Sequence, residues 1–326
     1  MTMRLRLLGN SGIRVSELCL GTMTFGTEWA WGADEAECRV IYGAFREAGG
    51  NFVDTSSNYT DGTSERILGR LIAHERDEVV VGTKFTFPTA AQNPNSAGAH
   101  RKSLRISVEG SLQRLSTDHL DVLWVHAWDQ CTPIDETMRA LDDLVRAGKV
   151  LAVGCSNMPA WVASQANAVA GLRGWTPFSA MQVQYSLAER SADADLLPMA
   201  HAHQLATLAW SPLGRGRLTG KHDADQLSPT EQRVVDLVSD VAQQLGVTRA
   251  QVALAWVRQQ GLMPVLGARS REQIADNLGS LAVQLNDGQF AMLDDATRID
   301  RGYPHEWLDA RHRRAVFTRE GVEGSR

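Results

Sequence analysis

The stretch HRKSLRISVEGSLQRLSTDHLDVLWVH, residues 100–126, contains a helix-like segment followed by a strand-like segment. Its first part, 100–116, spaces apolar residues three and four positions apart, which is the pattern of an amphipathic helix. Its second part, 120–126, is a short apolar run rich in Val and Leu, which is typical of a buried parallel strand. A histidine, His126, closes that run. We therefore interpret the stretch as one helix–strand unit whose strand ends in a polar residue.

The same unit recurs along nearly the whole chain. Segment 33–50 carries acids in its first turn and ends in glycine, and segment 134–149 ends in a basic turn with glycine; these features favour helices. Eight units of this kind predict an α/β fold of the (β/α)8 TIM-barrel type rather than an open doubly wound sheet. The strand candidates are ELCLGTM (17–23), NFVDT (51–55), EVVVGTKF (78–85), LDVLWVH (120–126), VLAVGCS (150–156), SAMQVQYS (179–186), LATLAWSP (205–212) and LMPVLGA (262–268).

A dinucleotide-binding open sheet would need the pattern G-x-G-x-x-G directly after its first strand. The nearest approach is formed by Gly214, Gly216 and Gly220, which miss that spacing and follow the seventh strand. We reject the open sheet on this ground. No composition shift marks a boundary, so residues 1–326 are interpreted as a single domain.

Composition excludes several classes of protein. The chain has 326 residues and a formal net charge of −5 without a run of Lys or Arg, which disfavours binding to nucleic acid or to an anionic membrane. Its four cysteines are scattered, with neither CxxC nor zinc-like spacing, and this favours a reducing cytoplasm. Neither a signal-peptide core nor an 18-residue apolar run occurs, so we expect a cytoplasmic protein.

Polar residues close the predicted strands. Asp54, Lys84 and His126 end the second, third and fourth strands, and Tyr59 follows Asp54 in a loop. The C-terminal ends of barrel strands open onto one face, so these four side chains should converge. A lysine ammonium favours the phenolate form of a tyrosine and lowers its pKa from about 10, while an aspartate holds the lysine. The sequence therefore predicts a proton-transfer site, with His126 donating a hydrogen bond to a carbonyl oxygen.

In this order, the motifs resemble those of the aldo-keto reductase family over roughly residues 4–285. Segments 93–129 and 132–141 are most similar to its aryl-alcohol dehydrogenase-like and potassium-channel β-subunit-like branches. The motifs are DTSSNY (54–59), GTK (82–84), VH (125–126), GCSN (154–157), MQVQYS (181–186), WSPLGRGRLTGK (210–221) and GARSREQIADN (267–277). The segment between Lys221 and Glu231 is shorter than this branch usually carries.

The resemblance implies a barrel whose bottom is plugged by an N-terminal β-hairpin, residues 3–16, and it leaves an irregular C-terminal tail. It also implies NADPH-dependent reduction of an aldehyde or ketone, and we expect an aromatic or hydrophobic one. Tyr59 would be the general acid, Lys84 and Asp54 would tune it, and His126 would position the carbonyl.

The resemblance further implies an NADP site along the strand ends. Ser156, Asn157 and Gln182 match residues that hold the carboxamide, and Trp210 matches the aromatic residue beneath the nicotinamide. Arg269 follows the last strand, and its fork of donors suits a 2′-phosphate. The remaining expected contacts are Gly21, Thr22, Met23 and Asp54 near the nicotinamide, Ser211, Pro212, Leu213, Gly214, Arg215, Gly216 and Lys221 at the pyrophosphate, and Gly267, Gln273, Asp276 and Asn277 at the adenosine end.

The tryptophans divide by their position relative to the strands. Trp29 and Trp31 follow the first strand and Trp128 follows the fourth, so with Tyr59 and His126 they are expected to line an aromatic substrate pocket, unless they pin loops. Three others, Trp161, Trp175 and Trp256, lie in or beside helical patterns and are interpreted as packing residues. Trp307 in the tail is a candidate to close the pocket.

Two other functions remain open from the residues. One is an NADP-binding regulatory module of the channel β-subunit type, and the other is a barrel isomerase or lyase that uses Asp and His without nicotinamide. His201 and His203 lack the further ligands that a metal site needs, so no metal is expected. The expected partner is a small carbonyl compound, and the sequence leaves monomer and homo-oligomer equally open.

Overall fold

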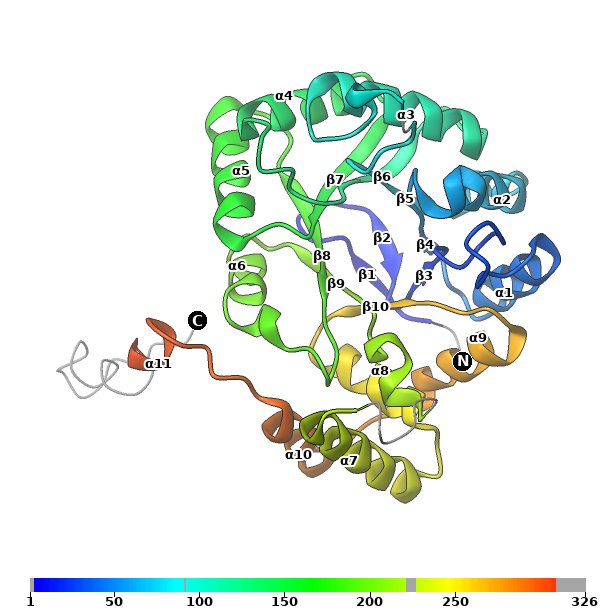
Figure 1. The fold of residues 1–326 in the computed structure, drawn as a ribbon, viewed down its shortest axis with the longest axis vertical. Coiled ribbons are helices and arrows are strands. Elements are labelled where there is room, and N and C mark those ends of the chain that lie inside the picture. The colour runs from blue at the N-terminus through cyan, green and yellow to red at the C-terminus, as the bar shows by residue number, and fades with distance from the viewer. Residues whose placement is uncertain (1–2, 91, 221–226, 309–326) are drawn as a thin grey trace.

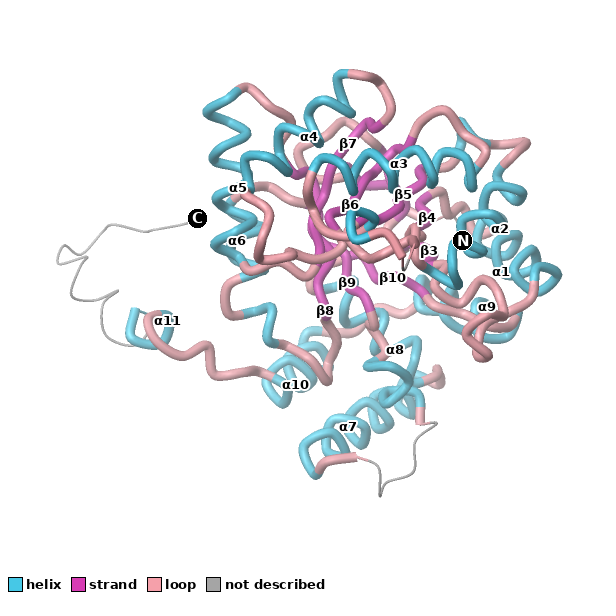
Figure 2. Tube along the Cα trace, turned by 45° about the horizontal axis from the view of Figure 1, so that its top comes forward, coloured by secondary structure: helices cyan, strands magenta, loops and turns pink. Residues whose placement is uncertain are grey.

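Eight parallel strands form a closed barrel in the computed structural model, which describes residues 3–90, 92–220 and 227–308. The strand order is β10-β3-β4-β5-β6-β7-β8-β9, and the helices surround this ring (Figures 1 and 2). The predicted (β/α)8 barrel is therefore confirmed. Its strands are β3 (Cys19–Gly21), β4 (Phe52–Asp54), β5 (Val80–Phe85), β6 (Leu120–Val125), β7 (Val150–Ser156), β8 (Phe178–Gln184), β9 (Ala206–Trp210) and β10 (Met263–Leu266).

The helices begin where local sequence signals favour a cap. Ser228 and Thr248 each accept a hydrogen bond from the third residue of the helix they precede, and that residue's side chain bonds back to form a capping box. The predicted helices 33–50, 100–116 and 134–149 are confirmed, each shorter by a few residues. The helices are α1 (Glu35–Glu47), α2 (Thr63–Ile72), α3 (Arg101–Leu115), α4 (Ile134–Arg146), α5 (Ala160–Arg173), α6 (Leu196–Ala202), α7 (Pro229–Leu245), α8 (Arg249–Gln259), α9 (Arg271–Gly279), α10 (Asp287–Thr297) and α11 (His305–Trp307).

An antiparallel hairpin of β1 (Leu5–Leu7) and β2 (Arg14–Ser16) closes the end of the barrel at which the strands begin. Leu8 and Val15 are fully buried in the same apolar cluster as Phe52, the first residue of β4. The predicted N-terminal plug is thereby confirmed. Because the barrel strands run parallel, their polar ends lie together at the opposite mouth.

The chain leaves the barrel after α10 and runs as irregular backbone to α11, while residues 309–326 of the expected irregular tail lie outside the described residues. The Nε2 atom of His305 lies 2.8 Å from the carboxylate of Asp195, the residue directly before α6. Figure 1 shows α11 outside the ring of helices. Trp307 pairs with Tyr303 there, with ring centroids 6.5 Å apart, so the interpretation of Trp307 as a pocket-closing residue is not supported by this arrangement.

The barrel interior is packed around Trp124, whose side chain is fully buried. Glycines of the neighbouring strands leave room for the indole. A Cβ added at Gly154 would lie 2.4 Å from Cε3 and Cζ3 of Trp124, which is far inside van der Waals contact. The glycine is thus required by the size of Trp124, its partner on the adjacent strand β6.

We predict that Gly154→Ala destabilises the protein by about 1–3 kcal/mol, because the new methyl group overpacks the interior. Urea unfolding followed by circular dichroism measures this free energy. Gly171→Ala is the matched control, since nothing lies within 4 Å of a Cβ at that position of α5. The control should be neutral or slightly stabilising, and equal stability of the two variants would contradict the packing argument.

Candidate active site

Three adjacent strands bring the predicted catalytic side chains to one edge of the barrel mouth. Asp54 is the last residue of β4 and pairs in register with Gly82 of β5. Lys84 lies two residues further along β5, and the backbone N–H of His126, directly after β6, donates to the carbonyl of Phe85 at 3.0 Å. The expected convergence of these strand ends is therefore found in the structure.

A buried ion pair lies at the centre of the site. The Lys84 ammonium donates to the Asp54 carboxylate, and both side chains are only 2% exposed. The other Asp54 oxygen accepts a hydrogen bond of 2.9 Å from the amide of Gln182 on β8. Burial lowers the pKa of Lys84, but the attraction of Asp54 and Tyr59 outweighs it and raises that pKa above its usual value. Lys84 is therefore an ammonium at neutral pH.

Tyr59 lies within reach of this ammonium. The Lys84 Nζ atom is 3.2 Å from the Tyr59 hydroxyl, and it also donates to the carbonyl of Thr55 at 2.8 Å. Burial raises the pKa of Tyr59 above that of a free tyrosine, and the neighbouring Lys84 charge offsets only part of this effect. The pKa of Tyr59 is therefore raised, whereas the sequence predicted that it would be lowered. Burial destabilises the phenolate more than the Lys84 ammonium stabilises it. The phenol is protonated at neutral pH.

His126 faces the same phenol. Its ring centroid is 5.9 Å from that of Tyr59, in an edge-to-face arrangement, and its Nδ1 atom lies 3.2 Å from the Ser56 hydroxyl oxygen. Burial, helped by the positive charge of Lys84, lowers the pKa of His126 to about 2. The imidazole is consequently neutral throughout the physiological range and acts through hydrogen bonds.

Aromatic rings extend from the Tyr59 ring to exposed positions. Trp29 lies edge-on to Tyr59 at 6.3 Å between ring centroids, and Trp31 follows it at 5.7 Å. On the other side, Phe87 lies edge-on to His126 at 4.6 Å. Phe87 directly follows Thr86 (φ 105°), and neither residue was singled out in the sequence. These side chains form a continuous aromatic wall, which we define as Trp31, Trp29, Tyr59, His126 and Phe87.

Trp128 lies outside this wall and contacts a different ring. Its indole is 5.5 Å from that of Trp161, edge-to-face, and Trp161 is 62% exposed. The interpretation of Trp161 as a packing residue is therefore wrong, because the first turn of α5 directs it outward beside the strand-end loops. Trp256, by contrast, is fully buried as expected.

The predicted cofactor residues lie at the ends of the other strands of the ring. They follow β7, β8, β9, β10 and β3, which are contiguous in the closed barrel, while β4, β5 and β6 carry the catalytic candidates. Most occupy last strand positions or the loops behind them. These are Gly21, Ser156, Asn157, Trp210, Ser211, Pro212, Leu213, Gly214, Arg215, Gly216, Gly267 and Arg269, with Met23 exposed beyond β3, whereas Gln182 lies within β8, two residues before its end. Lys221 lies outside the described residues.

Several of the predicted contacts use their side chains within the protein, Gln182 and Asn157 among them. The Thr22 hydroxyl is fully buried and lies 2.8 Å from that of Ser64. Asp276 accepts hydrogen bonds from the start of α8, at 2.8 Å from the Thr248 hydroxyl. The Asn277 amide donates to the carbonyl of Gly267 at 3.1 Å, and the Gln273 amide oxygen accepts from the Arg269 N–H at 2.9 Å. In this arrangement they shape the loops.

Three of the predicted cofactor residues line one cavity. A cavity of about 140 Å³ lies at the ends of β7, β8 and β9, lined among others by Asn157, Gln182 and Trp210. Within the described residues the buried indole N–H of Trp210 has no hydrogen-bond partner. Gly214, Arg215 and Gly216 all have positive φ angles, so the loop behind β9 follows the uncommon backbone that often forms anion-binding concavities.

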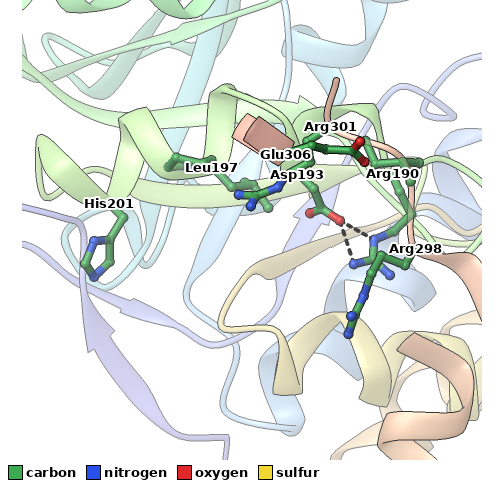
Figure 3. A pocket seen from close by; sticks show the side chains of 9 residues that line it. Arg190, Asp193, Leu197, His201, Arg298, Arg301 and Glu306 are labelled. Carbon is green, nitrogen blue, oxygen red and sulfur yellow. Dashed lines mark hydrogen bonds and ion pairs between the residues drawn. The ribbon is translucent and has the colours of Figure 1, made fainter. Parts of the chain in front are cut away.

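A second cavity, of about 960 Å³, lies away from these residues, between α6 and the segment after α10 (Figure 3). Its charged side chains are paired. The buried Arg190 bonds to Asp193 at 2.6 Å and lies 3.0 Å from Asp294, while Arg298 lies 2.8 Å from Asp295. The Arg190–Asp294 pair joins α10 to the loop after β8, and the cavity contains none of the predicted catalytic residues.

Comparison with known proteins agrees with this arrangement. Residues 17–298 match the model of the aldo/keto reductase family. The chain belongs to the aldo/keto reductase family. It is 38% identical over 323 residues to a norsolorinic acid reductase of Aspergillus flavus, covering 93% of this chain and 83% of that protein.

Two aryl-alcohol dehydrogenases are also similar to this aldo/keto reductase. That of Pestalotiopsis microspora is 35% identical, with 94% of this chain and 85% of the relative covered. That of Phanerodontia chrysosporium, named for NADP(+), is 32% identical, with 92% and 87% covered. Members of the family are oxidoreductases that act on small carbonyl compounds and generally use NAD(P)H. No helix of the described ranges is long and apolar enough to cross a membrane.

The neutral His126 predicts a pH dependence of stability. Its pKa of about 2 in the folded state lies below the value near 6.5 of an unfolded chain. Between these values the unfolded state binds one more proton, so stability falls as the pH decreases below about 6.5, at up to about 1.4 kcal/mol per pH unit.

We expect the free energy of unfolding of His126→Asn to depend less steeply on pH between 6 and 4 than that of the wild type. Chemical denaturation at several pH values measures both slopes. NMR of the labelled imidazole should show a neutral ring down to pH 4. A ring that titrates near pH 6 would contradict the burial argument.

Proposed function

We propose that this aldo/keto reductase uses NADPH to reduce an aromatic or other hydrophobic aldehyde or ketone, with Tyr59 as the general acid. The observation that carries the proposal is the position of the Lys84 ammonium. It bonds at once to the buried Asp54 carboxylate and, at 3.2 Å, to the Tyr59 hydroxyl, at the open mouth of the barrel. A phenol held in this way is suited to proton transfer.

In the proposed reaction the protein's side chains handle the proton and the carbonyl oxygen. A nicotinamide held at the neighbouring strand ends would supply the hydride that the carbonyl carbon receives. Tyr59 gives its proton to the carbonyl oxygen, and the adjacent ammonium of Lys84 stabilises the phenolate that results. Asp54 keeps Lys84 charged and in place. The neutral imidazole of His126 orients the carbonyl oxygen by a hydrogen bond.

The preference for NADP rests on Arg269. This residue is exposed at the end of β10, directly before α9, whose N-cap is Ser270. Its guanidinium pairs with no carboxylate within the described residues, and only a contact of 3.4 Å with the Trp31 carbonyl is seen. A free fork of donors beside a helix N-terminus suits the 2′-phosphate of the adenosine.

The substrate class follows from the aromatic wall. Trp29, Trp31 and Phe87 place flat apolar faces on both sides of Tyr59 and His126. An aryl ring beside the reacting carbonyl would bury against these faces, which contributes about 1 kcal/mol per favourable ring pair beyond the area buried. The names of the two aryl-alcohol dehydrogenases are consistent with this choice.

We predict that Tyr59→Phe lowers kcat for aldehyde reduction at least about a hundredfold while NADPH still binds, because only the proton donor is removed. A panel of aryl and alkyl aldehydes followed at the NADPH absorbance band measures turnover, and quenching of tryptophan fluorescence measures cofactor binding. NADPH binding by the wild type without turnover of any carbonyl would favour the regulatory module instead. Absence of NADPH binding would favour an isomerase or lyase.

Arg269 is predicted to discriminate between the two nicotinamide cofactors. Arg269→Gln should raise the Kd of NADPH by about ten- to a hundredfold, since a charge-assisted bond to a dianion is lost, and leave that of NADH nearly unchanged. Arg298→Gln is the control, because this exposed arginine lies behind α10 and pairs with Asp295. An equal effect of Arg269→Gln on both cofactors would contradict the phosphate assignment.

A further inference from the structure

The residue that follows the proposed proton donor has an unusual backbone. Thr60 has φ 43° and ψ 47°, and Asp61 follows with φ 54°. Left-handed conformations are uncommon outside glycine and are strained for a β-branched residue. Such strain persists only where surrounding contacts hold it, and it is typical of functional loops. The contacts of Thr60 therefore show what this turn is held against.

The Thr60 side chain is buried and makes two hydrogen bonds at once. Its hydroxyl donates to the carbonyl of Phe25 at 2.7 Å and accepts the backbone N–H of Ser64 at 3.0 Å. The first bond reaches the loop after β3, and the second reaches the first turn of α2. Thr60 is 1% exposed, so water cannot replace either bond.

Ser64 connects this turn to the strand ends. Its hydroxyl donates to the carbonyl of Thr22 at 2.7 Å and lies 3.0 Å from the hydroxyl of Thr55. Thr22 in turn is bonded through its backbone N–H to the carbonyl of Asp54 at 2.9 Å. The turn after Tyr59 is thus fixed to β3 and β4 by buried hydroxyl groups, directly beside the Asp54–Lys84 pair.

The loop that Thr60 holds is residues 24–33, which we call the tryptophan loop because it carries Trp29 and Trp31. Its two ends are joined by reciprocal backbone bonds between Thr24, Gly26 and Ala33. On its far side the Thr24 hydroxyl donates to the carbonyl of Ala268 at 2.6 Å, directly before Arg269. The loop therefore spans from the proposed proton donor to the proposed adenosine end.

We propose that Thr60 is a positioning residue: its hydroxyl holds the left-handed turn that sets Tyr59 against Lys84 and fixes the tryptophan loop beside the reacting centre. This inference rests on the proposed function and assigns to Thr60 a role that acts through Tyr59. The bonds of the Thr60 hydroxyl go to the backbone of Phe25 and Ser64 and not to the aromatic wall. Loss of this hydroxyl should therefore change the positions of the Tyr59 phenol and of Trp29, and it should remove no contact with the substrate.

The test compares two replacements of similar size. Thr60→Val keeps the branched shape but leaves the Phe25 carbonyl and the Ser64 N–H without partners, whereas Thr60→Ser keeps the hydroxyl. We expect kcat to fall about ten- to a hundredfold in Thr60→Val, since a displacement of about 1 Å has effects of that size, and to recover to within about threefold in Thr60→Ser. The limb of the pH profile at which reduction falls off should move to higher pH in Thr60→Val, because Tyr59 loses part of its contact with Lys84.

Thr63→Val is the matched control, since that hydroxyl has only an exposed contact of 3.4 Å with Arg66. Thermal unfolding and NADPH binding show that each variant is folded. Thr60→Gly separates the two contributions, because it relieves the backbone strain without restoring the hydroxyl, and we expect it to remain as slow as Thr60→Val.

A readout independent of turnover keeps this inference separate from the proposed function. In protein labelled with 13C-tyrosine, the Tyr59 Cζ resonance, assigned with Tyr59→Phe, should shift at pH 7 in Thr60→Val and not in Thr60→Ser. If the wild type reduces no carbonyl, the proposed function fails while this measurement still decides the role of Thr60. An unshifted Tyr59 resonance, or wild-type kcat in Thr60→Val, would overturn the inference.

Discussion

The site depends on a charge pair that is withdrawn from water. Lys84 and Asp54 are both almost fully buried, and an unpaired charge in that position would be strongly destabilising. Each charge can therefore be buried only because the other one is present. The pair also fixes geometry, because Asp54 bonds to Gln182 across the barrel and Lys84 bonds to the Thr55 carbonyl. An ammonium held at both sides has few positions available, and Tyr59 lies beside the one it occupies. In a site without a nucleophile, such electrostatic preorganisation is the main means of stabilising charge in the transition state.

The residues proposed for acid–base chemistry and those proposed for cofactor binding lie on different strands of the barrel. Three neighbouring strands, β4 to β6, carry the proposed acid–base residues, and the other five carry the residues proposed to bind the cofactor. The tryptophan loop after β3 lies where the two sectors meet. Its bonds to Thr60 on one side and to Ala268 on the other make it part of both. Cofactor and substrate would thus share a wall that the backbone holds in place.

Strand ends could be predicted because the signal is local: a polar residue that stops an apolar run is visible in the sequence. Asp54, Lys84 and His126 were all found in this way, and so was the barrel itself. The contributions of Thr60 and Thr22 could not be predicted, since their partners Phe25 and Ser64 lie 35 and 42 positions away. The direction of the Tyr59 pKa was missed for a related reason. The charge of Lys84 can be identified in the sequence. The burial of Tyr59, which outweighs the effect of that charge on the pKa, depends on the assembled fold.

Closure of the ring joins the two ends of the barrel sequence. β10 pairs with β3 through Val265 and Cys19. The outer edge of β3, the first barrel strand, therefore stays unpaired until β10, the last strand, has formed. Contacts of such sequence separation are slow to form, and an uncovered parallel edge invites pairing with other chains. During synthesis on the ribosome the strands up to β9 would emerge as an open sheet with exposed edges at β3 and β9. The hairpin of β1 and β2 is the exception, because its strands are adjacent in sequence and can pair as soon as they leave the exit tunnel.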